Sequence, residues 1–457
     1  MNKKSKVLLL SLAIFTVNAG QALAEVSAEE AAKLGEELTP YGATRAGNED
    51  GSIPAWTGGM VKPPAAYEGE GTTRIDPFAD EKPLFTIDAS NYNEYADNLS
   101  AGQKKMFETF PDTYKMPVYE THRTAAAPEW VYDNISKNAV NATLTQDGNG
   151  VTGAYGGIAF PIPQNGTEAI WNHNLRWIGL ATFKDFVAKT VYPNNSVDVS
   201  GAKQWEKYPY YKEGEYNPDY NGSLLKFLIE YTAPVRRKGE LFVVQEPLDI
   251  AESPRQSWQY IPGQRRIRRA PTVAFDTPNP TANGKLTYDD VYMFNGSPER
   301  YNWKLLGKKE MYIPYNNNKW IAHAEGGDAA HSDLLTPDHL NPEFERFEKH
   351  RVWVVEATLK EGKRHIYGKR VFYLDEDTWN IVLADNFDGK DNLWRSAQAH
   401  LLNAYDVPAT VLRSYVFYDF QDPSYYVAEM DTKPIKFYEG ESSSFFTPAQ
   451  LRKKSRR

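Results

Sequence analysis

Alternation between apolar and polar positions is the main pattern of residues 224–430. In residues 224–233 one side of an extended chain is apolar, formed by Leu225, Phe227, Ile229 and Tyr231. A period of two is typical of a half-buried β-strand. Similar segments predict further strands at 241–245, 256–261, 265–269, 352–359, 365–374, 380–386, 410–420 and 425–430. Because short turns join most of these segments, we expect a mainly β (α+β) fold built on an antiparallel sheet.

Helical patterns are few. Residues 26–38 begin with Ser27 as a cap and have acidic residues in the first turn, although Gly35 favours an early end. A second short helix is predicted at 100–110 and a third at 167–176. The fourth is predicted at 393–405, because Leu393, Ala397, Leu401 and Ala404 share one helical stripe.

Proline and glycine interrupt the pattern between residues 40 and 128, which contain nine prolines. Proline lacks an amide donor and glycine costs conformational entropy, so regular elements must be short here. The segment still carries aromatic anchors, namely Trp56, Phe78, Phe85 and Tyr92. We therefore expect a Pro/Gly-rich N-terminal arm at 25–130 packed on the body, an antiparallel β-domain at 131–445, and a basic C-terminal tail at 446–457.

The first 24 residues have the pattern of a secretory signal peptide. Three lysines precede a short apolar run at 7–17, and the A-x-A triplet at 22–24 offers a cleavage site. We expect cleavage after Ala24 and export to the periplasm. The alternative, an uncleaved anchor, is disfavoured because the apolar run is too short to span a bilayer well. No later stretch is long and apolar enough, so we do not expect the protein to span the membrane.

Composition excludes several classes of function. The chain has 457 residues and no cysteine, which excludes a disulfide scaffold, a zinc-thiolate site, an iron–sulfur cluster and a cysteine nucleophile. Removal of residues 1–24 would take away three lysines and no acid, lowering the net charge from −8 to −11. A negative protein is poorly suited to nucleic acid. The exception is residues 451–457, with five cations, which form either a solvated end or a contact for anionic head groups.

No motif in the sequence nominates a catalytic or metal site. The P-loop, HExxH and GxSxG patterns are missing, and the GxGxxG at 148–153 is followed by prolines instead of a helix. We read that segment as a glycine-rich turn, and we expect no enzyme activity, no cofactor and no metal.

Two other segments stand out chemically. Residues 258–269 join an aromatic strand to four arginines, Arg265, Arg266, Arg268 and Arg269, whose guanidinium groups suit phosphate or carboxylate. The alternative is ion pairing with acids such as Asp289 and Asp290. Residues 155–176 join a Gly/Pro-rich loop to a helix with Trp171, His173 and Arg176, which either lines a pocket or plugs the core by packing.

Several sequence blocks carry a family resemblance. They are EELTP at 36–40, DGSIPAWTGG at 50–59, EKPLF at 81–85, the block from FPIP to Arg176 at 160–176, LTPDHLNP at 335–342 and the block at 351–379. With these blocks the chain, from Val26 to the C-terminal region, closely resembles a large, mostly uncharacterised family of Gram-negative periplasmic proteins. That family is often labelled outer-membrane lipoprotein-sorting proteins.

The resemblance implies a distant branch of the LolA/LolB-like superfamily, since residues 258–269 are similar to its YLP-x-x-x-R-x-R segment. The implied fold is a strongly curved antiparallel sheet, an incomplete β-barrel with packed helices and an apolar cavity. The implied function is to carry a hydrophobic or amphiphilic molecule, a lipid or lipid-like, across the periplasm. The implied partners are an RND-type inner-membrane transporter and an outer-membrane partner.

These expectations nominate residues for a binding site. The candidate cavity residues are Phe227, Ile229, Trp258, Tyr260, Trp353 and Phe372. The candidate contacts for a head group or a partner are Arg265, Arg266, Arg268 and Arg269. The alternative function is an accessory or scaffold subunit of an RND-type envelope transporter that binds no ligand itself.

Overall fold

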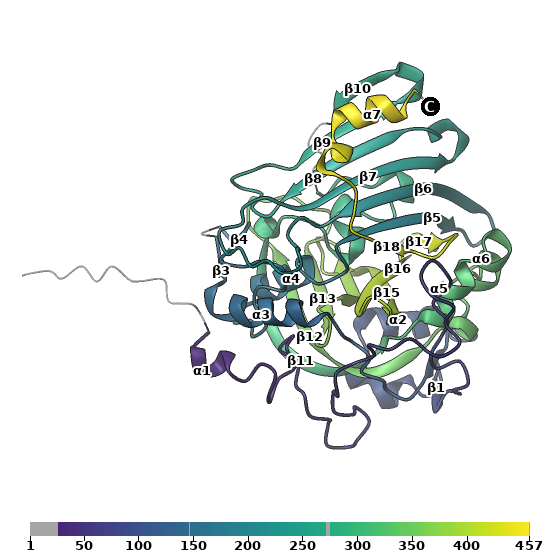
Figure 1. Ribbon diagram of the computed structural model, residues 1–457. Helices are drawn as coiled ribbons and strands as arrows, with labels where there is room; N and C mark the ends of the chain where they lie inside the picture. Colours follow the sequence, from purple (N-terminus) through teal and green to yellow (C-terminus); the bar gives the residue numbers. More distant parts are fainter. Residues whose placement is uncertain (1–25, 146, 271–274, 457) are drawn as a thin grey trace, which may run out of the picture.

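One large curved sheet forms the framework of the molecule (Figure 1). The computed structural model describes residues 26–145, 147–270 and 275–456, so the expected signal peptide lies outside the described residues. The sheet has 16 strands in the order β1-β2-β12-β13-β14-β15-β16-β17-β5-β6-β7-β8-β9-β10, with β11 paired to β12 and β18 to β5. It runs from β1 to β10 without closing into a barrel, and its pairs are antiparallel except for one contact of β2 with β12.

The strands of this sheet are long in the body of the chain. Their bounds are β1 Phe85–Ile87, β2 Met116–Val118, β5 Ala181–Val191, β6 Val197–Lys207, β7 Ser223–Ala233, β8 Leu241–Pro247, β9 Gln256–Ile261, β10 Arg266–Arg269, β11 Tyr301–Pro314, β12 Phe347–Leu359, β13 Lys369–Asp375, β14 Ile381–Phe387, β15 Leu393–Ala404, β16 Ala409–Asp419, β17 Ser424–Asp431 and β18 Lys436–Phe437. Strands β3 Thr143–Leu144 and β4 Val151–Thr152 form a separate pair. The predicted mainly β, antiparallel architecture is confirmed.

Helices are short and lie around the sheet (Figure 1). They are α1 Ala28–Ala31, α2 Ala101–Thr109, α3 Glu129–Asn141, α4 Gly166–Asn174, α5 Asn318–Ala324, α6 Asp328–Leu334 and α7 Pro448–Lys454. Short 3₁₀ turns that matter below are η2 Val235–Arg237, η3 Pro262–Gln264, η4 Pro280–Ala282 and η5 Tyr288–Met293. The predicted helices at 100–110 and 167–176 are confirmed as α2 and α4. None of the helices in the described chain is both long and apolar enough to cross a bilayer.

Two local predictions are wrong. Residues 393–405 form strand β15 and not a helix. The helix expected at 26–38 ends after one turn, α1, although Ser27 and Glu30 make the expected capping box. The connection between β9 and β10 is the 3₁₀ turn η3, which ends with Arg265 in the left-handed region.

The Pro/Gly-rich segment lies against the sheet through buried anchors. Arg74, only 3% exposed, forms a two-pronged ion pair with Asp406, at 2.6 and 2.8 Å. Arg123 does the same with Asp377, at 2.8 and 2.6 Å. The indole of Trp56 donates to the carbonyl of Ala125 at 2.9 Å. Bidentate arginine–aspartate pairs therefore hold this irregular segment against the sheet, where regular backbone hydrogen bonding is sparse.

The C-terminal residues form a helix docked on the convex side of the sheet. Helix α7 packs against β8, β9 and β10, and Leu451 is fully buried there (Figure 1). Leu451 and Phe446 form a small core with residues of the outward face, namely Leu228, Leu241, Val243 and Tyr260, with Trp205, Trp258 and Ile267 packed against it. Helix α7 is thus anchored by the burial of Leu451, and the cations Arg452, Lys453 and Arg456 remain exposed.

Candidate functional site

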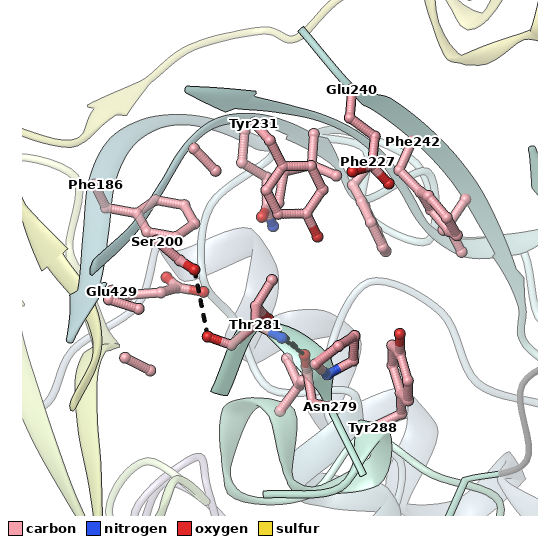
Figure 2. Close-up of a pocket in the computed structure, with 18 of the residues that line it drawn as sticks. Phe186, Ser200, Phe227, Tyr231, Glu240, Phe242, Asn279, Thr281, Tyr288 and Glu429 are labelled. Carbon is pink, nitrogen blue, oxygen red and sulfur yellow. Dashed lines mark hydrogen bonds between the residues drawn. The ribbon is translucent and has the colours of Figure 1, made fainter. Parts of the chain in front are cut away.

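A cavity of about 490 Å³ lies on the concave side of the sheet. One wall consists of side chains of the sheet, from β16 and β17 through β5 to β9, and the other of the crossing segment 279–295. Figure 2 shows Phe186, Tyr231, Phe227 and Phe242 on the sheet side, facing Asn279, Thr281 and Tyr288 on the crossing segment. The volume lies in the range of small-molecule sites, about 300–1,000 Å³.

Strand alternation builds the sheet wall. On β7, Phe227, Ile229 and Tyr231 line the cavity, while Leu228 between them is buried on the opposite, convex face. On β8, Phe242 and Val244 line it in the same way. The apolar face predicted at 224–233 is therefore the face that the cavity uses.

Buried charges anchor the crossing segment. Asp289 and Asp290 contact Arg370 at 3.0 and 2.6 Å, and Asp289 also contacts His365 at 3.1 Å. Burial raises the pKa of Asp289, but Arg370 and His365 outweigh it and hold the pKa at about 2. The segment is consequently held to β13 by charge-assisted bonds, which keeps the cavity wall in place.

A polar network adjoins the cavity through Tyr292 and Glu429, which line it. Lys184 lies 2.9 Å from Glu206, whose carboxylate also accepts a hydrogen bond from the Tyr292 hydroxyl at 2.5 Å. Burial pushes the pKa of Glu206 up, but Lys184 and the hydrogen bonds lower it to about 2, so the Glu206 carboxylate is ionised at neutral pH. Glu429, which lines the cavity, pairs in turn with Arg413.

Most charges on the cavity wall have a partner. Arg237 contacts Glu240 at 2.8 Å and stacks over Tyr231, and Arg255 contacts Glu246 at 2.5 Å. Arg236 differs, because it is exposed and makes no ion pair within the described chain. A guest would thus meet apolar side chains and neutralised charges inside, and one available cation at Arg236.

The structure separates the predicted cavity residues. Phe227 and Ile229 line the cavity. Trp258 and Tyr260 lie on the convex face under α7, since β9 presents Ser257 and Gln259 to the cavity instead. Trp353 stacks on Trp379, and Phe372 is buried against Phe294 and Trp303, both away from the cavity lining.

The predicted arginine cluster lies at the free edge of the sheet. Arg265, Arg266, Arg268 and Arg269 are exposed on the β9–β10 turn and on β10, the last strand in the order. Asp289 and Asp290 are not their partners, because both are buried with Arg370. No ion pair of these four arginines occurs in the part of the chain that the structure describes.

The segment 155–176 acts mainly as a packing plug. His173 is completely buried, and its ring contacts the carbonyls of Trp379 and Tyr292 at 3.1 and 3.0 Å. Burial, followed by the neighbouring Arg176, lowers the pKa of His173 well below its usual value, so the ring is neutral. Trp171 and Arg176 also line a smaller cavity of about 60 Å³, which shares Glu246, Arg255, Tyr292 and Asn295 with the main one.

Sequence reasoning missed several lining residues, including Phe186, Phe242, Tyr288 and Tyr292. Phe242 and Val244 alternate on β8 as clearly as the β7 residues do, and this signal could have nominated them. Tyr288 and Tyr292 lie in irregular chain, where no period marks the inner face.

One buried cluster has donors of the kind that bind metals. Single ligand atoms of His350, Asp375 and Asp377 lie within 4.8 Å of one another. Arg123 already takes both oxygens of Asp377, at 2.8 and 2.6 Å, so the charge there is compensated by a guanidinium. The cluster therefore supports arm packing in this structure.

Comparison with known proteins gives a family model and a relative that each match most of this chain. A family model described as "Protein of unknown function (DUF1329)" matches residues 86–452. The uncharacterized protein PA3922 of Pseudomonas aeruginosa is 41% identical over 463 residues, which cover 98% of this chain and 99% of that protein.

Solved structures give only distant matches. A DUF1329 family protein from Desulfovibrio piger has a TM-score of 0.40 at 15% identity, covering 60% of this chain and 92% of that one. The LolA superfamily protein NE2245 from Nitrosomonas europaea has a TM-score of 0.37 at 12% identity, covering 63% and 100%. Likeness at this level supports no argument about function.

Proposed function

Since this chain belongs to the DUF1329 family, whose function is unknown, we propose a function from the cavity itself. The protein is a periplasmic binding or carrier protein for a hydrophobic or amphiphilic molecule, lipid or lipid-like, and assists its transport across the envelope. The observation that carries this proposal is the cavity of about 490 Å³ with Phe186, Phe227, Ile229 and Phe242 on its sheet wall.

The energetics suit reversible carriage. Each methylene moved from water into such a cavity contributes about 0.8 kcal/mol, so a chain of a few carbons gains useful affinity without becoming irreversible. The internal charges are paired and would not be left uncompensated by an apolar guest. Arg236 is placed to meet an anionic head group at the cavity wall.

The location and the partners belong to the same proposal. The signal-peptide pattern at 1–24 supports export to the periplasm. The resemblance to lipoprotein-sorting proteins supports work beside an RND-type transporter and an outer-membrane partner. We propose binding and release of cargo, with no chemical step.

The test is to identify what the purified protein holds. We would express the full chain, purify it from the periplasm, and analyse solvent extracts by mass spectrometry. The proposal expects a co-purifying lipid-like molecule, and displacement of it by a dansyl-labelled fatty acid.

A cavity-filling variant links the binding to this site. Ser257 faces the cavity and its neighbour Gln256 is exposed on the same strand, so Ser257→Trp and Gln256→Trp form a matched pair. We expect Ser257→Trp to weaken probe binding at least about tenfold, because the indole occupies the volume of a guest. Gln256→Trp should bind normally. If the extracts contain no bound molecule and the wild-type protein does not bind the probe, the carrier proposal is wrong and an adaptor without cargo is the remaining function.

A further inference from the structure

Three segments far apart in the sequence meet at one end of the sheet. The turn from β7 to β8 lies beside the turn from β9 to β10, since a Cβ added to Gly239 would lie 3.5 Å from Pro262 Cγ. Helix α7 runs toward the same end. Just before the helix, the carbonyl of Phe446 accepts a hydrogen bond from Gln245 Nε2, near the end of β8, at 2.7 Å. In the last turn of the helix, Lys454 contacts Glu230 of β7, and Glu230 lies opposite Leu241, the first residue of β8. Figure 1 shows the C-terminus beside these turns.

This end of the molecule is strongly basic. Residues 230–240, 261–270 and 448–456 hold eleven lysines and arginines and two glutamates, a net charge of +9 in a chain whose total is −8. Both glutamates are already paired, Glu230 with Lys454 and Glu240 with Arg237. We call the exposed cations of these segments the basic tip: Arg236, Lys238, Arg265, Arg266, Arg268, Arg269, Arg452, Lys453 and Arg456.

An exposed apolar side chain lies among these cations. Val235, on the β7–β8 turn, is 89% exposed and directly precedes Arg236. The other large exposed hydrophobic residues of the described chain are 38–67% exposed and lie outside the three segments. A protruding apolar residue flanked by cations is the chemistry that enters the boundary between lipid head groups and acyl chains.

We infer that the basic tip docks on an anionic phospholipid surface. The tip consists of turn ends and a helix end, so its cations are spread over a projecting surface instead of converging on one anion. Such an arrangement suits a layer of phosphates, which attracts each nearby cation without requiring a fixed geometry. The rest of the chain is negative and is repelled by the same surface, so only this end faces the bilayer.

Docking there would also orient the cavity. Tyr231, Arg236 and Arg237 line the cavity and belong to the β7–β8 end of the sheet, so this part of the cavity wall lies next to the docked surface. The docking itself goes beyond the proposed function and does not depend on cargo, so each can fail without the other.

The test is co-sedimentation of the full protein with vesicles. Binding is compared between phosphatidylcholine vesicles with about 30% phosphatidylglycerol and pure phosphatidylcholine vesicles, in 50 mM and in 500 mM NaCl. We expect binding to the anionic vesicles in low salt and its loss in high salt, because screening shortens the range of the attraction.

Charge-reversal variants locate the surface. The tip variant is R265E/R266E/R452E/K453E, which leaves the cavity lining intact. The control is K62E/K82E/K304E/K309E, which reverses four exposed lysines elsewhere, the same number of cations, and changes the net charge equally. The tip variant should bind anionic vesicles at least about tenfold more weakly, and the control should bind like the wild-type protein apart from a small loss.

Three results would overturn the inference. One is equal binding to both kinds of vesicle, and another is an equal loss in the two variants, which would show a response to net charge alone. The third is that the folded wild-type protein does not bind anionic vesicles in low salt, whether or not its tip captures an acidic protein instead. Circular dichroism and thermal melting of both variants establish that they are folded.

Discussion

Arg413 is a fully buried cation on β16 between two carboxylates of β17. It pairs with Glu429, which lines the cavity, and with Asp431. Replacing it by Met would leave the buried Asp431 without its cation and Glu429 with only Lys184, 3.4 Å away, so we expect Arg413→Met to cost about 3–5 kcal/mol of unfolding free energy. Urea denaturation measures this. The control is Arg364→Met at an exposed position, for which a change within about 0.5 kcal/mol is expected. Equal stability of the two variants would contradict the prediction.

Asp375 is a buried acid that favours its protonated form. Burial, followed by the nearby Asp377 carboxylate, raises its pKa to about 7 from the usual 3.8. At a pH between 3.8 and about 7, Asp375 is deprotonated in the unfolded chain but still protonated in the folded chain. The contribution of Asp375 to stability is therefore present at low pH and is lost as the pH rises to about 7.

The sign of that effect makes Asp375→Asn a test. Because Asn cannot ionise, the free energy of unfolding of the variant should rise by roughly 1–3 kcal/mol relative to that of the wild-type protein between pH 5 and pH 8. Urea titrations at several pH values measure the difference, and Arg364→Met serves as the control in the same series. A constant difference across that range would be evidence against a raised pKa at Asp375.

At the scale of elements, the sequence predicts strands with a clear alternation better than strands that are buried on both faces. Strand β7 alternates Phe227, Ile229 and Tyr231 with the charged Lys226 and Glu230, and this alternation identifies it as a strand, although Leu228 is buried on the convex face. Strand β15 is buried on both faces, with α2 and α5 packed against it, and it carries polar residues that have buried partners. Arg395 pairs with Asp419 and His400 with Glu345. These partners are distant in sequence, so the polar positions imitated the exposed face of a helix.

Helix α7 shows how a charged tail is fixed by one apolar residue. Leu451 is fully buried against the convex face, whereas Gln450 beside it is partly exposed. We expect Leu451→Ala to release the helix, because truncating a buried Leu costs about 2–5 kcal/mol and Leu451 is the buried residue of α7.

Hydrogen exchange checks this locally. Amides of α7 should exchange at least about tenfold faster in Leu451→Ala, with little change in β12 to β16, while Gln450→Ala should exchange like the wild-type protein. Uniformly faster exchange would mean that Leu451 supports the whole fold instead of the docking of one helix.

At the scale of the molecule, the cavity depends on contacts between segments that are distant in the sequence, and local sequence patterns do not reveal these contacts. Trp258 and Tyr260 are apolar strand residues like Phe227, and sequence alone does not say which face of β9 is concave. The answer depends on α7, which arrives from the C-terminus and covers their side. The second wall, residues 279–295, lies opposite the sheet because Arg370 holds Asp289 and Asp290, a pairing across about eighty residues.

Because the cavity has one wall on the sheet and one on the crossing segment, cargo that binds between them should stabilise the folded protein. A ligand that binds only the folded state adds about 2.7 kcal/mol at a hundred times its Kd, which for a protein of this size corresponds to a rise of roughly 3 °C in Tm. We expect this rise when palmitate, below its aggregation concentration, is added to delipidated protein and melting is followed by circular dichroism. Ser257→Trp should show a much smaller rise and Gln256→Trp the full one. If Ser257→Trp responds like the wild-type protein, the fatty acid binds elsewhere, and the cavity between the β5–β9 wall and the crossing segment is not its site.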